Sequence, residues 1–238
     1  MTRPYPYDVA PQPVQSVADA ASPPGGILAS GELSGQIAIA DWFGQFILRP
    51  IDIAAARANR TAEMLNFIDQ LGDELGTQHA ARTITAFLSG HGPEQIVRQL
   101  GHLHVLLFEG IAGPEAISLC ESSYAGEGEC RVLAPFQEMR AMLRDLDVSV
   151  DVRCREPADH LAIELAALAE AMRQGKPALV APMILRLSRW VPAVAEAVSR
   201  AGLSPVHTAM FALLDAFVAD LGSFLSQGRN SLSGVCDV

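Results

Sequence analysis

The sequence predicts an all-α protein, a single helical bundle preceded by a proline-rich tail. From Gly35 onward, apolar residues recur at steps of three and four, which is the period of helices that bury one face. Half of the 238 residues are hydrophobic and only 18% are charged, as is typical of a globular chain with a large core. The only alternating run, Val148, Val150 and Val152, is too isolated to form a sheet. We interpret it as an extended connection.

The first 30 residues differ in composition from the rest of the chain. They contain six prolines and end near the pair Gly25-Gly26, so they offer little apolar surface to bury. We therefore predict a flexible tail over residues 1–30 and a helical domain over residues 31–238. A docking role for Tyr5 and Tyr7 is the alternative interpretation of the tail.

The apolar spacing predicts seven helices after the tail. Pro50 ends the first, Pro93 fits the first turn of the third, and Gly175 and Gly202 follow the fifth and sixth in the position of C-terminal caps. The apolar positions are Ile39, Phe43, Phe46 and Ile47; Met64, Ile68, Leu71 and Leu75; Ile96, Leu100, Leu103 and Leu107; Phe136, Met139, Leu143 and Leu146; Leu161, Leu165, Leu168 and Met172; Met183, Leu187, Trp190, Val194 and Val198; and Met210, Leu214, Phe217, Leu221 and Leu225.

The most apolar segment, residues 178–198, is not predicted to span a membrane. Two arginines and a glutamate interrupt it before it reaches the roughly 18 uncharged residues that a span requires. Pro182 and Pro192 also lie inside it, which predicts a helix that is kinked or split.

Charge and cysteine content narrow the possible partners and the compartment. The formal net charge of -10 disfavours nucleic acid and anionic lipid, because an acidic surface repels phosphate, and it suits a partner with clustered positive charge. The four cysteines form no CxxC motif, which favours reduced thiols over a disulfide framework. The N-terminus has neither the cationic start nor the apolar run of a secretory leader. We therefore expect a cytoplasmic protein.

A first candidate site lies between residues 102 and 124. A helix ends in Leu107-Phe108, and a loop containing Gly110 then leads to Glu121-Ser122-Ser123-Tyr124. Large apolar residues beside a flexible loop can form a groove, although ordinary core and turn is the alternative. His102 and His104 point about 200° apart on a helix, so they cannot easily share a metal ion.

A second candidate site is Glu156-Pro157-Ala158-Asp159-His160, which opens the helix that buries Leu161. One interpretation is structural, with the proline in the first helical turn and the carboxylates near the positive end of the helix dipole. His160 and Glu164, at i and i+4, could instead serve a small metal-dependent hydrolase. No third metal ligand stands at a recognisable spacing, and the chain has no GxSxG, HExxH or phosphate-loop motif. A general helical adaptor is a further alternative.

Three motifs in sequence resemble the redox-enzyme maturation chaperones of the TorD/DmsD/NarJ family, and the TorD/DmsD type most closely. They are Leu107-Phe108 with its glycine-bearing loop and Glu121-Ser122-Ser123-Tyr124, then Pro157-Ala158-Asp159-His160, then Arg189-Trp190-Val191-Pro192. Their order and spacing agree with the family over roughly residues 35 to 226. The proline-rich tail and the stretch Gly126-Glu127-Gly128-Glu129-Cys130 depart from it.

The resemblance implies a non-catalytic chaperone with a TorD-like all-α fold and no cofactor or metal of its own. Its partner would be the catalytic subunit of a molybdopterin-dependent oxidoreductase of the dimethyl sulfoxide or trimethylamine N-oxide reductase type. The chaperone would bind the twin-arginine leader and the apo form of that subunit until the cofactor is inserted. Some such chaperones are domain-swapped dimers, and weak guanine-nucleotide binding is associated with a few. We therefore expect a monomer or a domain-swapped homodimer.

The leader's basic start and apolar middle suggest two binding devices. Glu156 and Asp159 would pair with guanidinium groups through directional, charge-assisted hydrogen bonds. A groove lined by Leu107, Phe108 and Tyr124 would accept the apolar stretch. His160 could hydrogen-bond the leader backbone or orient Asp159. Because a helix N-terminus repels cations, we expect the groove to supply most of the affinity.

Overall fold

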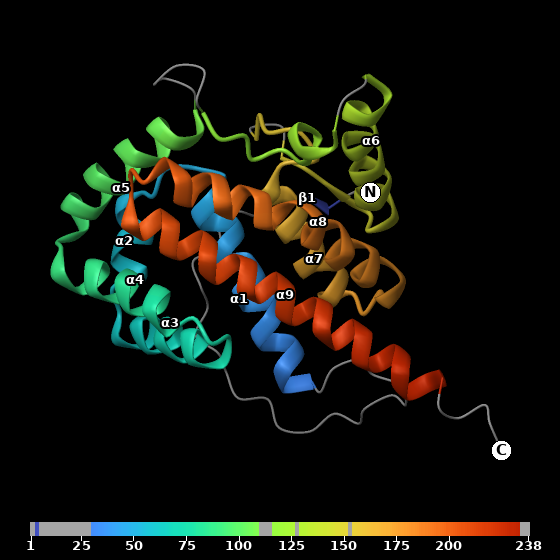
Figure 1. Ribbon diagram of the computed structural model, residues 1–238, viewed down its shortest axis with the longest axis horizontal. Helices are drawn as coiled ribbons and strands as arrows, with labels where there is room; N and C mark the ends of the chain where they lie inside the picture. The colour runs from blue at the N-terminus through green and yellow to red at the C-terminus, as the bar shows by residue number, and fades with distance from the viewer. Residues whose placement is uncertain (1–2, 5–29, 110–115, 127–128, 152–153, 234–238) are drawn as a thin grey trace.

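The all-α prediction is confirmed by the computed structural model, which describes residues 3–4, 30–109, 116–126, 129–151 and 154–233. Within these residues the chain forms nine α-helices, one 3₁₀ helix and two strands of two residues each (Figure 1). The α-helices are α1 (Ser30–Leu48), α2 (Ile53–Ala58), α3 (Ala62–Glu74), α4 (Gln78–Gly90), α5 (Pro93–Phe108), α6 (Glu129–Asp145), α7 (Leu161–Arg173), α8 (Pro177–Ala201) and α9 (Pro205–Ser233). The 3₁₀ helix is η1 (Glu121–Tyr124), and the strands are β1 (Arg3–Pro4) and β2 (Val148–Ser149).

Helix α7 forms the centre of the bundle. Every residue from Leu161 to Ala169 is buried, because α1 packs on one side of the helix and α8 on the other. Helix α9 runs antiparallel to α8 and crosses the face of the molecule in Figure 1. Its apolar side meets Phe43 of α1, whose ring lies 5.9 Å from that of Phe217. The predicted apolar faces therefore meet in one continuous core.

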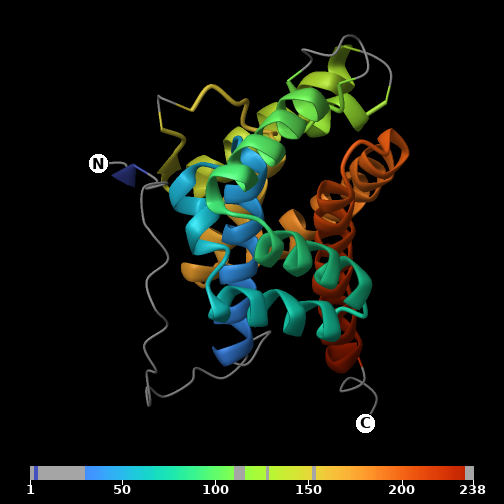
Figure 2. The same ribbon diagram turned by 90° about the vertical axis from the view of Figure 1, so that its left-hand side faces the viewer.

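The remaining N-terminal helices form a second group that packs against α9 and α5 (Figure 2). Helices α3 and α4 form an antiparallel pair whose close approach depends on Gly72. A methyl group at that position would lie 2.3 Å from the Cβ of Ala81. Helix α4 then packs on α9, and the short α2 packs on α5.

The structure corrects three details of the sequence prediction. Helix α8 is unbroken from Pro177 to Ala201. The predicted split is wrong because each internal proline removes only one main-chain donor, while the apolar residues around it stay packed in the core. Helices α2 and α4 were not predicted. The extended segment after α6 also has a pairing partner, since β2 pairs in parallel with β1, Arg3 opposite Val148.

Length and composition alone would allow α8 and the Pro205–Leu225 part of α9 to cross a membrane. Core helices of globular proteins meet the same criterion, and both helices bury one face in this bundle. The predicted boundary at residue 30 falls at the start of α1. The flexible tail stays a prediction, because residues 5–29 lie outside the described part of the chain.

Candidate functional site

The two candidate segments run antiparallel and contact each other at the N-terminal end of α7. Cys120 and His160 form an isolated antiparallel bridge. The Glu121 amide donates to the Asp159 carbonyl at 3.0 Å, and the Leu161 amide donates to the Leu119 carbonyl at 2.8 Å. These bonds join the loop after α5 to the start of α7, which are about 40 residues apart in the sequence. We call this pair of segments, residues 116–126 and 156–161, the clasp.

Asp159 is the buried anchor of the clasp. Its side chain is only 1% exposed, and its carboxylate accepts a 3.0 Å hydrogen bond from the Ser122 amide in η1. A buried amide without an acceptor is costly, so this carboxylate both satisfies η1 and fixes its position. Asp159 therefore holds the loop in place. Its carboxylate is too buried for direct contact with an arginine that approaches from solvent.

His160 is the N-cap of α7. Its Nδ1 accepts a 3.2 Å hydrogen bond from the Ala162 amide, so the neutral ring carries its proton on Nε2. Burial lowers the pKa of His160 to about 4, a shift that the nearby Asp159 opposes. Pro157 lies in the turn before the helix, where its carbonyl accepts from the His160 amide at 3.0 Å. The expectation that this proline occupies the first helical turn is therefore wrong.

Among the described residues of the predicted site, Glu156 is the exposed one. Its side chain is 42% exposed, and its Oε2 lies 3.8 Å from His160 Nε2. It also lies close enough to Cys120 to affect that thiol. Burial raises the pKa of Cys120 to about 11, with the charge of Asp159 and then, more weakly, that of Glu156 adding to the shift. Glu156 thus stands at the solvent edge of the clasp.

The predicted apolar residues have different surroundings. Leu107 belongs to the core at 2% exposure, and its carbonyl accepts from the Ile117 amide at 2.8 Å, which closes the base of the loop. Phe108 is half-buried, with its ring 5.1 Å from that of His104 and 5.6 Å from that of Phe211. Gly110 lies outside the described residues.

Tyr124 ends η1 and faces α8. Its ring lies 5.5 Å from that of Trp190, tilted by 32°, and its hydroxyl donates to the Ser118 carbonyl at 2.9 Å. The side chain is half-buried, and burial raises the pKa of the phenol. Tyr124 and Phe108 therefore rest on different helices, α8 and α9. The loop between them passes through the residues that are not described.

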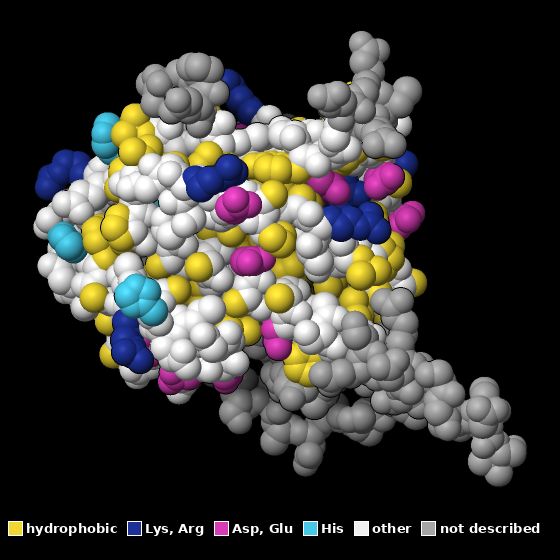
Figure 3. Space-filling model, in the orientation of Figure 1, with side chains coloured by type: hydrophobic (Ala, Val, Ile, Leu, Met, Phe, Trp, Pro, Cys, Tyr) yellow, Lys and Arg dark blue, Asp and Glu magenta, His cyan; other side chains and the backbone are white. Residues whose placement is uncertain are grey.

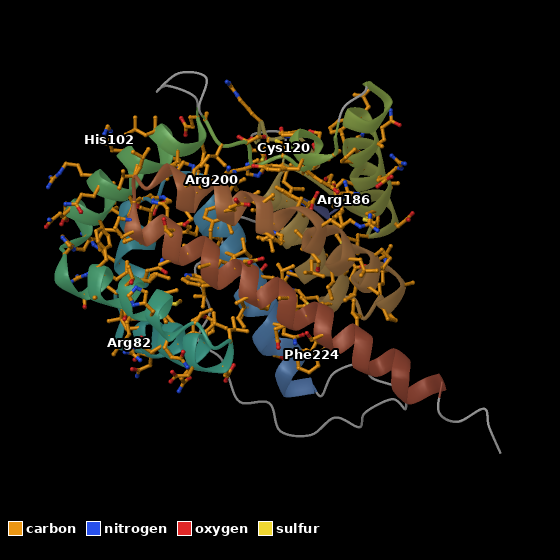
Figure 4. The ribbon with its side chains drawn as sticks, viewed as in Figure 1. Arg82, His102, Cys120, Arg186, Arg200 and Phe224 are labelled. Atoms are coloured by element: carbon orange, nitrogen blue, oxygen red, sulfur yellow. The ribbon has the colours of Figure 1, made fainter. Side chains whose placement is uncertain are left out.

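Sequence reasoning missed a buried charged group beneath η1. Arg186 of α8 donates from Nε to Glu164 Oε1 at 3.1 Å and from Nη1 to Glu138 Oε2 at 2.9 Å, and its Nη2 contacts Glu121. Figure 3 shows acidic and basic side chains together at the edge of the face where α6 and α8 meet, and Figure 4 labels Arg186 there. In the sequence, this arginine was noted only as one of the charges that interrupt an apolar segment.

The positive charge of Arg186 does not fully offset the effect of burial on the pKa values of the two carboxyl groups beside it, Glu164 and Glu121. Burial raises the pKa of Glu164 to about 8, with Arg186 opposing the shift, and burial likewise raises the pKa of Glu121. The other Glu164 oxygen accepts from Trp190 Nε1 at 3.2 Å. Glu164 is therefore directed toward α8 and occupied there, which leaves it unsuited to a metal site or general base shared with His160.

Few of the described side chains offer reactive chemistry. Among the residues that the structure places, no group of three or more His, Cys, Asp or Glu side chains could hold a metal ion. Cys120 and Cys154 are free thiols. His102 is exposed and His104 is buried, and burial lowers the pKa of His104 to about 4. The polar groups of the site hold a loop in place.

The fold and the site thus define an all-α protein in which a polar clasp fixes a loop on the surface of a helical bundle. Comparison with known proteins identifies its family. Residues 61–198, more than half of the chain, match the family model described as nitrate reductase delta subunit. The chain belongs to this family of non-catalytic chaperones for molybdoenzyme maturation, as the motif resemblance implied. No curated protein matches the chain significantly.

Proposed function

We propose that this chain is a cytoplasmic chaperone that binds the twin-arginine leader and the apo catalytic subunit of a molybdopterin-dependent oxidoreductase. We infer that the client is of the dimethyl sulfoxide or trimethylamine N-oxide reductase type and is held until its cofactor is inserted, before export. Family membership supports the general role. The observation that carries the leader assignment is Glu156, an exposed carboxylate at the edge of a clasped loop that ends in a half-buried tyrosine.

The leader would meet charge and apolar surface at this edge. Glu156 can accept two parallel hydrogen bonds from an arginine, a geometry that lysine cannot reproduce. An exposed pair of this kind contributes only about 0–1 kcal/mol, so it selects the leader more than it tightens binding. Most of the affinity would come from half-buried apolar side chains, namely Pro157, Tyr124 and Phe108.

The buried residues of the motif take a supporting role in this proposal. Asp159 and His160 are 1% and 5% exposed, and hydrogen bonds to Ser122 and Ala162 already engage them. They would set the position of Glu156 and Tyr124 and not contact the leader's arginines themselves. Leu107 would act in the same way, as part of the core beneath the loop.

Titration calorimetry with synthetic leaders tests the proposal. The wild type should bind an Arg-Arg leader more tightly than a Lys-Lys control, and Glu156→Gln should lose up to about fivefold in affinity for the Arg-Arg leader. The same substitution should reduce the preference for the Arg-Arg leader over the Lys-Lys leader, because that preference depends on hydrogen bonds between the carboxylate and the arginines. Glu63→Gln, at an exposed site on α3, is the matched control.

A wild-type protein that binds the leader no better than a scrambled peptide would overturn the proposal and favour a general helical adaptor. Leaders from both reductase types can be compared in the same assay. Tighter binding of a leader from a nitrate reductase catalytic subunit would overturn the reductase type but not the leader-binding role.

A further inference from the structure

We propose that Arg186 and Glu164 are positioning residues for the leader-binding surface, although neither residue is exposed to the leader. They would hold η1 in place from beneath and so fix where Tyr124 and the clasp stand. This inference rests on the proposed function for the identity of the ligand. The positioning itself can be tested without a ligand.

Arg186 joins three parts of the chain that are separate in sequence. Its guanidinium contacts Glu121 of η1, Glu138 and the Pro135 carbonyl of α6, and Glu164 of α7. The Pro135 carbonyl lies 2.5 Å from Nη2. Because the planar guanidinium presents its donors in a fixed fork, the partners are held in one relative geometry.

A second route from the same helix reaches the other end of η1. Trp190 follows Arg186 by four residues on α8, so the two side chains share a face. Glu164 receives hydrogen bonds from both of them, and the Trp190 ring packs on Tyr124 at 5.5 Å. Arg186 thus holds Glu121, the first residue of η1, and Trp190 supports Tyr124, the last.

Stability alone is a poor explanation for this arrangement. Replacing a buried ion pair by well-packed apolar residues is often neutral or stabilising, because two charges no longer have to be desolvated. An apolar pair at positions 164 and 186 could fill the same space between α7 and α8. It could not reach across to the carboxyl group of Glu121 on η1, and that reach is what the Arg186 guanidinium provides.

The sharpest test compares two glutamates that contact the same arginine. Glu121→Ala removes the partner on η1, whereas Glu138→Ala, the matched control, removes a 65% exposed partner on α6. We expect amide hydrogen exchange across residues 116–124 to speed up roughly tenfold in Glu121→Ala and to stay at the wild-type rate in Glu138→Ala. Leader affinity, measured by calorimetry, should fall severalfold only in Glu121→Ala.

The double variant Arg186→Met with Glu164→Leu removes the buried guanidinium and the carboxyl group beside it. Its urea midpoint should fall, because Trp190 Nε1 and the Glu121 carboxyl group lose their partners, and residues 116–124 should exchange at least as fast as in Glu121→Ala. Equal loop exchange in Glu121→Ala and Glu138→Ala would overturn the inference, and that comparison decides alone if the double variant does not fold. If the wild type binds no leader, the proposed function fails, and exchange still tests the positioning role.

Discussion

His160 offers a direct test of the site's electrostatics, because it is a buried neutral base whose charge change can be removed while its cap is kept. Burial lowers its pKa to about 4, whereas the unfolded chain should have a value near 6.5. As pH falls below 6.5 the unfolded state binds a proton first. The stabilising effect of the neutral ring is therefore fully present above pH 6.5 and is lost as pH falls toward 4.

The magnitude follows from the same two pKa values. Linkage costs about 1.4 kcal/mol per pH unit while only the unfolded state is protonated, so moving from pH 7 to pH 5 should cost about 2 kcal/mol from His160 alone. In His160→Asn the amide oxygen can still cap α7, but this titration is gone. Urea unfolding followed by far-UV circular dichroism should therefore give a variant that loses about 2 kcal/mol less than the wild type between pH 7 and pH 5.

Taking the difference between variant and wild type removes contributions from other groups. His104 and His207 have pKa values lowered to about 4 by burial and add to the acid sensitivity of both proteins. Burial raises the pKa of Glu164, so this residue makes both proteins more stable as pH falls, which is opposite to the effect of the histidines. His102→Asn, at an exposed site on the same helix as His104, is the control and should lose as much stability between pH 7 and pH 5 as the wild type does. An identical pH dependence in His160→Asn and wild type would refute the assignment of a buried neutral cap.

Three further predictions concern packing, thiol reactivity and the clasp. Gly72→Ala should lower the free energy of unfolding in urea by about 1–3 kcal/mol, because the new methyl would lie 2.3 Å from a side-chain carbon of α4. Gly35→Ala, where the new methyl meets open space within α1, should raise the same free energy by about 0.5–1 kcal/mol, because alanine favours the helix more than glycine does. A variant with Cys120 as its only thiol should react with Ellman's reagent at pH 8 roughly a hundredfold more slowly when folded than in urea, because burial raises the pKa from 9.0 to about 11. Asp159→Ala should cost about 1–3 kcal/mol in urea unfolding by leaving the Ser122 amide without its acceptor, and Asp159→Asn, which can still accept, should cost less.

The sequence predicted the helices with four or more large apolar residues in helical spacing and missed α2 and α4, which bury fewer of them. Helix α4 buries Ala80, Ala81, Ile84 and Leu88, and the two alanines give little periodic signal. The small size of Ala81 matters because Gly72 lies opposite, a relation between two helices that periodicity in one helix cannot reveal. The six-residue α2 is short for such a pattern, although its N-cap aspartate was a usable signal.

The sequence singled out two separate segments as candidate sites but did not predict their contact or their exposure. The structure joins the loop after α5 to the start of α7 through the antiparallel bridge. Glu156 and Asp159 carry the same chemical group three residues apart, yet one side chain is 42% exposed and the other is buried. The difference depends on Ser122, which is distant in sequence and supplies an amide to only one of them. Arg186 could not be found for the same reason, since its partners come from three separate segments.

The arrangement of Glu156 to His160 accounts for the structural interpretation of this segment and is compatible with the proposed function. A cation approaching the N-terminus of α7 meets the unfavourable end of the helix dipole, but Glu156 lies five residues before Leu161 and outside the first turn. His160 directs the protonated Nε2 of its neutral ring toward Glu156 at 3.8 Å, while Nδ1 satisfies the Ala162 amide. The cap therefore uses the imidazole without adding a positive charge beside the carboxylate. In the proposed function, a charged histidine would compete with the leader's arginine for Glu156, so the burial that keeps His160 neutral would leave that carboxylate available to the leader.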